Sequence, residues 1–452
     1  MTRIEKLLIE LGDITWGTPL LVLLLGGGLF FLVYSRLIPF RHFGHSIRII
    51  LGKYDNPEEP GQISHFQALS TALAGTVGMG NVTSVAVAIT TGGPGAIFWM
   101  WASALVGMAT KFFTCSLAVM YRGRDSMGNI QGGPMYFITE GLGRKWKPLA
   151  IFFSAAGMIG VSPLFQTNQL TQVIRDVILI PRGIPDTLTT NLILGTGIMI
   201  LVGSVVLGGI KRIGKVAGSL VPFMVILYMV SVIYILFSNP SQILPGLKLI
   251  IKDAFTAESV LGGAVGTIII TGVRRAAFSN EAGIGTAPMA HGAARTREPV
   301  REGMVAMMEP LIDTIIVCTM TALAIIVTGV WTHTDADGIT LTAEAFNQAI
   351  PGFGPYILIV CVSVFSLTTL FAFPYYGTKC FGFIFGARYQ NIYTYAYTLV
   401  IPLGSVGTLG AVISLFDGAY ALMAFPTMIA ALLLSPGVMR AAKDYFDRIK
   451  TG

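Results

Sequence analysis

The sequence predicts an all-α membrane protein in which one extra helix precedes two five-helix repeats of opposite orientation. Three observations support this prediction. The 452 residues are 53% hydrophobic and only 12% charged, with a mean hydropathy of +0.71, which is far more apolar than a soluble chain of this length. Apolar segments long enough to cross a bilayer recur along the whole chain. Two of these segments are interrupted by glycine and polar residues at corresponding places, which is typical of an inverted repeat.

Eleven segments have the length and apolar character of membrane-spanning helices. The segment at 15–36 is the extra helix, the next five segments form the first repeat and the last five form the second. After the first, they are 66–90, 95–121, 148–174, 190–209, 214–238, 258–290, 301–330, 353–373, 392–415 and 417–434.

This order divides the chain into four parts. Residues 1–65 hold the extra helix and a cytoplasmic loop, and residues 66–238 form the first five-helix repeat. Residues 258–434 form the second, inverted repeat, and residues 435–452 are expected to be a cytoplasmic tail.

Lysine and arginine are distributed unevenly between the two sides that the eleven helices define. With the C-terminus in the cytoplasm, 21 of the 30 lysines and arginines fall in cytoplasmic segments and six fall in outside segments. Positive charge accumulates on the cytoplasmic side of membrane proteins, so the sequence predicts a multi-pass cell-membrane protein with its N-terminus outside. The net charge of +7 is then an orientation signal, and we expect the lipid bilayer rather than nucleic acid as a partner.

Two segments carry interruptions that a membrane-spanning helix would not be expected to contain. The second segment contains AGTVGMGN (Ala74–Asn81), and the seventh contains TGVRRAAFSNEAGIG (Thr271–Gly285). The two segments are five helices apart and therefore cross the membrane in opposite directions. Such a pair indicates a secondary transporter whose binding site lies near the midplane, between the two breaks. The alternative is that the glycines are packing notches, but each cluster also contains hydroxyl, amide or charged side chains.

The sequence contains no signature of an enzyme. It has no Ser/His/Asp order, no metal-ligand cluster among its five histidines and no P-loop. We therefore expect neither catalysis nor ATP as an energy source, and an ion gradient is the expected driving force.

Three motifs resemble one known family. LAGTVGMGNV (Leu73–Val82), QGGPMYFI (Gln131–Ile138) and FSNEAGIGTAP (Phe278–Pro288) are together similar to the alanine or glycine:cation symporters. These are a branch of the amino acid–polyamine–organocation superfamily, and the resemblance covers nearly the whole chain. It implies the LeuT-type fold and uptake of small neutral amino acids, such as alanine and glycine, with sodium or sometimes protons.

The first break is expected to surround the carboxylate of a zwitterionic substrate. A half-helix that restarts at about Gly80 presents free N–H groups and the positive end of its dipole, and glycine lets the ligand approach the backbone closely. Carbonyl groups at the ends of the preceding half-helices suit an ammonium group or a cation. The residues expected to bind substrate here are Thr76, Gly78, Met79, Gly80 and Asn81.

The second break is expected to supply the opposite wall of the site. Thr271 and Gly272 are predicted to end the first half of this helix and to contact the substrate. Ser279 and Asn280 are predicted to cap the second half, with Asn280 also at the substrate. Glu281 would then lie in the first turn of the second half and complement its dipole.

The fourth helix is predicted to supply a third wall. In SPLFQTNQLTQ, Phe165, Gln169 and Gln172 repeat at helical spacing and share one face. We expect Phe165 to close over the substrate side chain and Gln169 to bind a polar end, although these amides alternatively hold helices together. Phe278 is a second candidate lid, and two aromatic lids would leave room for little more than glycine or alanine.

The superfamily pattern implies one sodium site between the first break and the ninth helix. Its ligands would be the carbonyls of Ala74, Val77 and Phe365 with the hydroxyls of Thr368 and Thr369. Five neutral oxygen ligands suit a hard monovalent cation that must also leave again. The alternative for the two threonines is hydrogen bonding to their own preceding turn.

Charged side chains inside spans are costly and usually functional. Glu309 and Asp313 are one helical turn apart on the eighth helix, Lys111 lies in the third, and Arg274 and Arg275 lie in the second interruption. We expect Lys111 or an arginine to pair with Glu309, as a structural element or a latch, and both arginines to be paired or to lie in a vestibule. A proton-coupling role for one of the acids is a further alternative.

Together these features predict a sodium-coupled importer of small neutral amino acids that works by alternating access. A proton-coupled carrier, or a LeuT-type carrier of another small solute such as a nucleobase, is the first alternative, and a channel or membrane sensor is the second. A second sodium site at Asn81 and Thr271 is left open.

Overall fold

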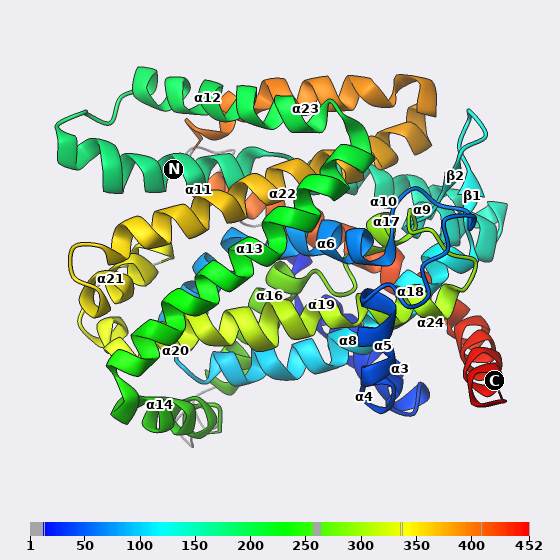
Figure 1. Ribbon diagram of the computed structural model, residues 1–452, viewed down its shortest axis with the longest axis horizontal. Helices are drawn as coiled ribbons and strands as arrows, with labels where there is room; N and C mark the ends of the chain where they lie inside the picture. Colours follow the sequence, from blue (N-terminus) through cyan, green and yellow to red (C-terminus); the bar gives the residue numbers. More distant parts are fainter. Residues whose placement is uncertain are drawn as a thin grey trace.

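The computed structural model describes residues 12, 14–255, 264–334, 336, 338–407 and 409–451. Within these residues the regular structure is helical apart from a hairpin of two short strands, β1 (Gly123–Arg124) and β2 (Ile130–Gln131) (Figure 1). The first six residues of the predicted seventh span, 258–263, lie outside the described residues.

Helices occur along the whole described chain, from Thr18 to Thr451. In order they are α2 (Thr18–Leu21), α3 (Gly27–Tyr34), α4 (Ile38–Arg41), α5 (Phe43–Ile50), α6 (His65–Thr76), α7 (Val85–Gly92), α8 (Ala96–Met120), α9 (Pro134–Tyr136), α10 (Lys147–Gly160), α11 (Leu164–Ile174), α12 (Leu188–Val206), α13 (Gly209–Ser238), α14 (Pro240–Asp253), α16 (Ala264–Asn280), α17 (Ala287–His291), α18 (Pro299–Ala306), α19 (Met308–Pro310), α20 (Thr319–Thr328), α21 (Ile339–Ala349), α22 (Gly354–Phe385), α23 (Gln390–Gly404) and α24 (Leu409–Thr451). Wider π-helical turns occupy Val22–Gly26, Gly80–Ser84, Phe137–Gly141, Arg175–Leu179 and Leu311–Cys318. Tighter turns occupy Arg144–Trp146, Ile180–Arg182, Val330–Thr332 and Ala387–Tyr389.

Among the described residues, seven helical stretches are long and apolar enough to cross a membrane, and the bent pair His65–Thr76 and Gly80–Gly92 makes up to eight. The seven are Ala96–Met120, Arg144–Arg182, Leu188–Val206, Gly209–Ser238, Pro299–Thr328, Gly354–Phe385 and Val412–Ile449. The predicted first span corresponds to a shorter apolar helix, Thr18–Tyr34. The count of eleven spanning helices therefore stays a prediction.

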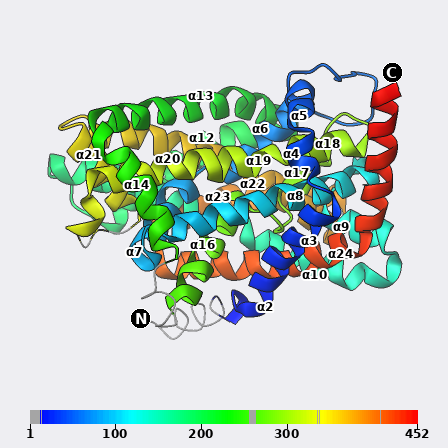
Figure 2. The same ribbon diagram turned by 90° about the horizontal axis from the view of Figure 1, so that it is seen from below.

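The connecting segments collect at two opposite ends of the helix bundle. Figures 1 and 2 place α14 and α21 at one end, and α5, α18 and the C-terminus at the other. This is the alternation expected between the segments predicted outside and those predicted in the cytoplasm. Which end faces the cytoplasm stays a prediction.

The first interruption is a broken helix, as predicted. The Ser64 hydroxyl and the Gln67 side chain form a reciprocal cap that starts α6. The helix stops at Thr76, and Val77 has an extended backbone with ψ at 96°. The chain resumes helical structure from Gly80 in a direction that differs by 52°.

The second interruption is also a break, but it lies farther along the chain than predicted. Thr271 and Gly272 do not end a half-helix, because α16 continues through both residues to Asn280. The chain leaves the helix at Glu281, whose φ is 54°, and Gly283 and Gly285 also have positive φ values. Glycine adopts this conformation without steric cost, so the GIG sequence provides the break.

Gly272 has a different role, which explains the error. A Cβ atom at this position would lie 2.6 Å from the carbonyl oxygen of Ala96 and 2.7 Å from the Cβ of Trp99. The glycine therefore allows α16 to pack directly against the start of α8. Gly272 is therefore a small residue that allows two helices to pack closely, which was the alternative interpretation of these glycines.

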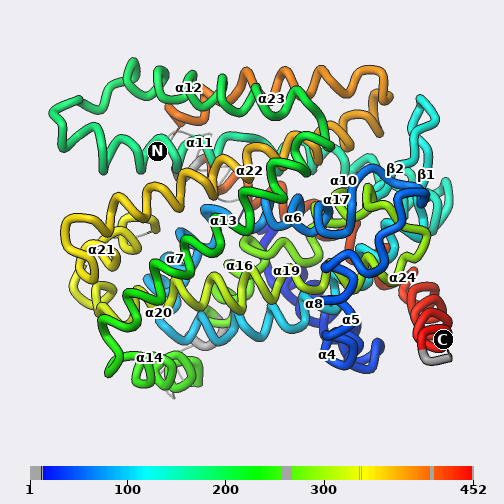
Figure 3. Tube along the Cα trace, in the orientation of Figure 1, coloured from blue at the N-terminus to red at the C-terminus, as the bar shows by residue number. Residues whose placement is uncertain are grey.

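The two broken helices run in opposite directions. Figure 3 shows the chain passing from α6 to α7 towards one end of the bundle and from α16 to α17 towards the other. Helix α16 packs against both α7 and the turn Gly80–Ser84. The inverted relation predicted from the sequence places the two breaks close together.

The last two predicted spans differ from the structure in their boundary. The turn between α23 and α24 begins at Ser405, about ten residues before the predicted gap at 416. Gly404 ends α23 and Gly407 lies in this turn. Helix α24 then continues to Thr451, so the predicted tail is helical over its described residues.

The notch at Gly272 gives a test of the helix packing. We expect Gly272→Ala to lower the free energy of unfolding by about 1–3 kcal/mol, because a methyl group has no space between α16 and α8. Thermal unfolding of the purified protein in detergent measures this. Gly197→Ala in α12 is the matched control, because a Cβ there meets nothing within 4 Å. Equal midpoints for both variants would contradict the close packing.

Candidate substrate and ion site between the broken helices

The first break lies directly against the middle of α22. A Cβ atom built on Gly78 would be 2.7 Å from the Oγ1 of Thr369 and 3.8 Å from the carbonyl oxygen of Phe365. Any residue larger than glycine would therefore collide with the threonine hydroxyl. The structure thus places the first break beside Phe365 and Thr369, although Gly78 and Thr369 are almost 300 residues apart in sequence.

Both threonine hydroxyls donate to carbonyl groups of their own preceding turn. Thr368 donates to Phe365 at 2.9 Å and to Val364 at 3.0 Å, and Thr369 donates to Phe365 at 3.1 Å. This is the alternative considered from the sequence. It occupies the Phe365 carbonyl with two hydrogen bonds, but it leaves the threonine oxygens able to contact a cation. A hydroxyl that donates its single hydrogen keeps its oxygen lone pairs, which are the groups that a cation needs.

Ala74 and Val77 are fully buried at the same break. The N–H of Val77 donates to the carbonyl oxygen of Leu73, and its own carbonyl lies where the regular helix has stopped. Their role as sodium ligands stays a prediction. Thr76 is also buried, and its hydroxyl donates to the carbonyl oxygen of Ala72.

Aromatic rings cover the other side of the break. A Cβ on Gly80 would lie 3.5 Å from the ring of Phe278. Phe278 and Phe165 meet edge to face, with ring centroids 5.5 Å apart, and Phe416 lies 5.7 Å from Phe165 and 5.4 Å from Phe278. Both predicted lid residues therefore belong to one buried aromatic cluster beside Gly80, together with Phe416. Met79 is fully buried as well.

The predicted polar residue of α11 has its hydrogen bonds within its own helix. The Gln169 amide nitrogen lies 3.2 Å from the Oδ1 of Asn168 and 3.1 Å from the Oε1 of Gln172. Asn168, rather than Gln169, reaches another element, because its amide donates to the carbonyl oxygens of Gly404 and Gly407. Contact of Gln169 with a substrate stays a prediction.

Thr271 and Gly272 lie away from this site. The side chain of Thr271 is next to Gly92, at the far end of α7 from Gly80. Along α16, Thr271 is about 12 Å from Ser279 at 1.5 Å per residue. The structure therefore does not bring Thr271 or Gly272 to the first break.

One asparagine stabilises each break in the same way. The Oδ1 of Asn81 accepts a hydrogen bond from the backbone N–H of Gly78 at 2.8 Å. The Oδ1 of Asn280 accepts one from the backbone N–H of Ala282 at 2.9 Å. Each amide thereby satisfies a backbone donor that the end of the regular helix would otherwise leave unpaired.

The same two amides donate to neighbouring residues of the π-helical turn Leu311–Cys318. Asn81 donates to the Oδ1 of Asp313 at 2.6 Å, and Asn280 donates to the hydroxyl of Thr314 at 3.0 Å. The Asp313 carboxylate also accepts from the hydroxyls of Ser279 and Thr314, both at 2.7 Å. Asp313 therefore joins the first break to the second.

Asp313 is fully buried, and its carboxylate is not paired with a cationic side chain. No lysine, arginine or histidine nitrogen among the described residues lies within 4.0 Å of it. A buried carboxylate inside a membrane protein is costly unless it is protonated, paired or bound to a cation.

Glu281 lies inside the second break rather than in the turn after it. Its carboxylate accepts hydrogen bonds from the hydroxyls of Tyr420 and Thr286, and Thr286 directly precedes α17. The predicted position in a new first turn is wrong, because the break begins at Glu281 itself.

A chain of five buried ionisable side chains connects α6, α8, α17, α18 and α19. The Lys111 ammonium lies 2.6 Å from Glu309, whose other oxygen lies 2.6 Å from the Nε2 of His291. The Nδ1 of His291 lies 2.6 Å from Glu302, which also contacts His65. The predicted pairing of Lys111 with Glu309 is confirmed, and the two histidines and Glu302 extend it.

The two intramembrane arginines share one acid. Arg274 and Arg275 lie 3.0 Å and 3.1 Å from the same oxygen of Asp417 in α24. Arg275 also lies 5.4 Å from the ring centroid of Phe278. Both arginines are therefore paired, as expected, at the edge of the aromatic cluster.

Sequence reasoning missed several of these residues. His65 and His291 lie at the ends of apolar segments, where a histidine carries no specific pattern. Asp417 is the single acidic residue near the predicted gap between the last two spans. This position could have identified it as a candidate partner of the arginines. Asp313 was identified as an intramembrane charge, but its partners are distant in sequence.

Comparisons with known proteins agree over the whole chain. The family model described as "Sodium:alanine symporter family" matches residues 1–452. An uncharacterized transporter of Haemophilus influenzae is 40% identical, over 99% of this chain and 97% of that protein. The sodium/alanine symporter AgcS of Methanococcus maripaludis is 38% identical, over 96% of this chain and 95% of that protein.

A solved structure shows the same fold. The crystal structure of MhsT in complex with L-phenylalanine matches with a TM-score of 0.63 at 13% identity, covering 84% of this chain and 90% of that one. The fold is that of the LeuT-type transporters, so the predicted fold class is confirmed. Together with the apolar helices, the comparisons describe a multi-pass membrane transporter and not an enzyme.

The buried ionic chain provides a test. We expect Lys111→Met to lower the free energy of unfolding by about 3–5 kcal/mol, because Glu309 would keep a buried charge without its ammonium partner. Unfolding of the purified protein in detergent measures the change.

The matched control removes both charges. The double variant Lys111→Met/Glu309→Gln should recover part of the loss, since neither charge then remains uncompensated. A single variant as stable as the wild type would show that the pair does not carry buried charge.

Proposed function

The chain belongs to the sodium:alanine symporter family, and on this premise we propose that it carries alanine and glycine with sodium by alternating access. Sodium-coupled amino acid transport is the activity of the family. The choice of small neutral substrates and the residues that bind them are the proposal.

The placement of Gly78 against Thr369 carries the proposal. It puts the broken helix directly against the Thr369 hydroxyl and close to the Phe365 carbonyl, where the carbonyls of Ala74 and Val77 and the hydroxyl of Thr368 are also expected. A hard monovalent cation requires such oxygen ligands. These residues therefore support a sodium site between α6 and α22.

The aromatic cluster supports a small substrate. Phe165, Phe278 and Phe416 meet beside Gly80, and all three side chains are buried. The bound amino acid would lie between these rings and the start of the restarted helix. Glycine or alanine needs less space there than a branched or aromatic substrate.

In this mechanism the sodium gradient drives uptake of the amino acid, and no chemical reaction is needed. One sodium ion crossing 100 mV gains about 2.3 kcal/mol, and a tenfold gradient adds about 1.4 kcal/mol. The sum supports about a 500-fold accumulation of substrate per ion. Sodium and the amino acid bind when the site is open to one side, the breaks close around them, and the other side then opens.

The decisive experiment is uptake of radiolabelled alanine into proteoliposomes. A sodium gradient, a lithium gradient and a pH gradient are imposed separately, and we expect only the first to drive strong accumulation. Uptake driven by the pH gradient alone would favour proton coupling through Asp313. Strong competition by leucine or uracil, but not by glycine, would contradict the proposed substrates.

The sodium site gives a separate prediction. Thr369→Val keeps the side-chain shape but removes the hydroxyl, so the sodium concentration for half-maximal uptake should rise about tenfold. The KM for alanine at saturating sodium should change little.

Thr398→Val is the matched control, because this threonine also bonds to its own preceding turn, in α23 and away from the break. Unchanged sodium dependence in the double variant Thr368→Val/Thr369→Val would rule out the site.

A further inference from the structure

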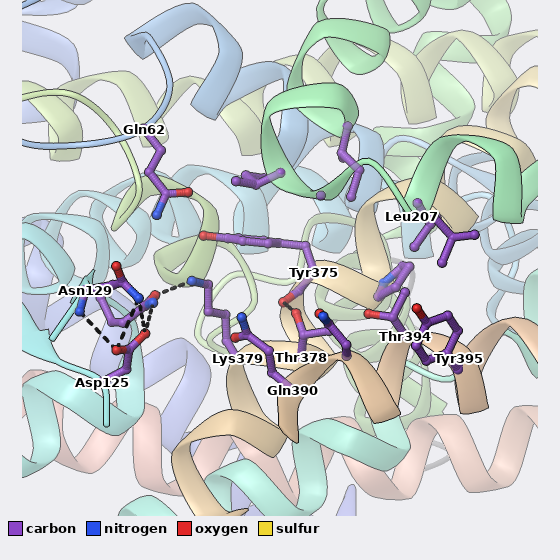
Figure 4. A pocket seen from close by; sticks show the side chains of 17 residues that line it. Gln62, Asp125, Asn129, Leu207, Tyr375, Thr378, Lys379, Gln390, Thr394 and Tyr395 are labelled. Atoms are coloured by element: carbon purple, nitrogen blue, oxygen red, sulfur yellow. Dashed lines mark hydrogen bonds between the residues drawn. The ribbon is translucent and has the colours of Figure 1, made fainter. Parts of the chain in front are cut away.

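A polar cavity lies beside the end of α22 that follows Pro374. Its volume is about 340 Å³, and its walls come from α22, the β1–β2 hairpin, the loop before α6, the turn between α12 and α13, and the start of α23. Figure 4 shows polar side chains from these elements pointing into it, among them Gln62, Asp125, Asn129, Thr378, Lys379 and Gln390. None of these residues belongs to the site between the breaks.

Lys379 brings a positive charge into this cavity. Its side chain is 91% buried, and its ammonium group donates to the Oε1 of Gln131 and lies 4.9 Å from the ring centroid of Tyr375. Within the described part of the chain, no carboxylate lies within 4.0 Å of the ammonium nitrogen. An ammonium group has three hydrogens to donate, so it retains donors for a ligand.

Asp125 brings a negative charge to the same cavity. Its Oδ2 accepts a hydrogen bond from the Gln131 amide at 2.8 Å, and its Oδ1 accepts from the backbone N–H groups of Met127 and Asn129. Partial burial raises the pKa of Asp125, but the bonds from Gln131, Asn129 and Met127 outweigh it and hold the pKa below its usual value. The carboxylate is therefore charged at neutral pH.

Gln131 holds the two charges apart. Its amide donates to Asp125 through nitrogen and accepts from Lys379 through oxygen. Here the intervening amide leaves a positive and a negative group on the wall of one cavity, which matches the two charges of a zwitterion.

The cavity lies on the same helix as the proposed sodium site. Lys379 follows Thr369 by ten residues of α22, which is about 15 Å along the helix. Figure 1 places the hairpin that forms part of the wall at the end of the bundle opposite α14 and α21. The sequence predicts that this end faces the cytoplasm.

We infer that this cavity is a transit site for the amino acid at the inner face, with Lys379 receiving the carboxylate and Asp125 the ammonium group. The inference rests on the proposed function, because it assumes a zwitterionic substrate that leaves the site between the breaks on this side. Gln131 positions both charged groups.

Transport measured from each face separately tests the inference. Inside-out and right-side-out membrane vesicles give the KM for radiolabelled alanine at the inner and outer faces. We expect Lys379→Met to raise the inner-face KM about tenfold, because a charged hydrogen bond to the carboxylate is lost. The outer-face KM should stay within about twofold. Lys379→Arg, which keeps the charge, should restore much of the inner-face affinity.

Two further variants keep the test decisive if Lys379→Met does not fold. Gln131→Glu has the same size and places a carboxylate against Lys379, and it should raise the inner-face KM in the same way. Asp125→Asn keeps an acceptor for the hairpin N–H groups and should also raise it. If only the lysine variant has an effect, the ligand is a simple anion, such as a lipid phosphate, and the zwitterion site is overturned.

Lys211→Met is the matched control, because Lys211 is an exposed lysine of α13 next to the cavity-lining residue Ile210 but does not line the cavity itself. Unchanged inner-face KM values in the Lys379 and Gln131 variants, with normal sodium-dependent uptake, would overturn the transit site alone. Absence of sodium-dependent alanine uptake by the wild type would overturn the proposed function.

Discussion

A helix that stops inside a bilayer releases backbone groups that find no water, and the rest of this structure is arranged around that constraint. Asn81 and Asn280 each satisfy one of these backbone groups in the same way. The side-chain amide oxygen accepts a hydrogen bond from a backbone N–H of the same break. Their amide nitrogens then bond to Asp313 and Thr314, which are adjacent in one π-helical turn. The breaks are thus stabilised by side chains of the protein itself.

The buried charges form separate groups with different surroundings. The chain from Lys111 to His65 alternates bases and acids, so each carboxylate touches a nitrogen base. Arg274 and Arg275 share Asp417 at the edge of the aromatic cluster. Asp313 and Glu281 are bonded only by neutral donors among the described residues. These two buried carboxylates are therefore better placed to respond to a cation or a proton than the carboxylates that already have cationic partners.

Local patterns in the sequence predicted the first break well. Three glycines with an asparagine at Ala74–Asn81 favoured a broken helix over other interpretations, and Thr369 lies against this break at Gly78. The role of Thr368 and Thr369 as sodium ligands stays a prediction. The second break was predicted too close to the N-terminal end of α16. The local sequence around Gly272 looks the same whether the glycine ends a helix or allows a neighbouring helix to pack closely. Only the position of α8 distinguishes the two cases. The histidines and Asp417 could not be placed from sequence, since their partners are fixed by tertiary contacts across distant helices.

The π-helical turn Leu311–Cys318 has a consequence for how the two halves move. A π-helical turn holds more residues than an α-helical turn, so Asp313 and Thr314 are oriented by the bulge itself, which begins directly after Pro310. Tightening this stretch into an α-helix would rotate both residues about the helix axis and withdraw a partner from each break at once. One local change in winding would therefore alter the contacts of both breaks simultaneously.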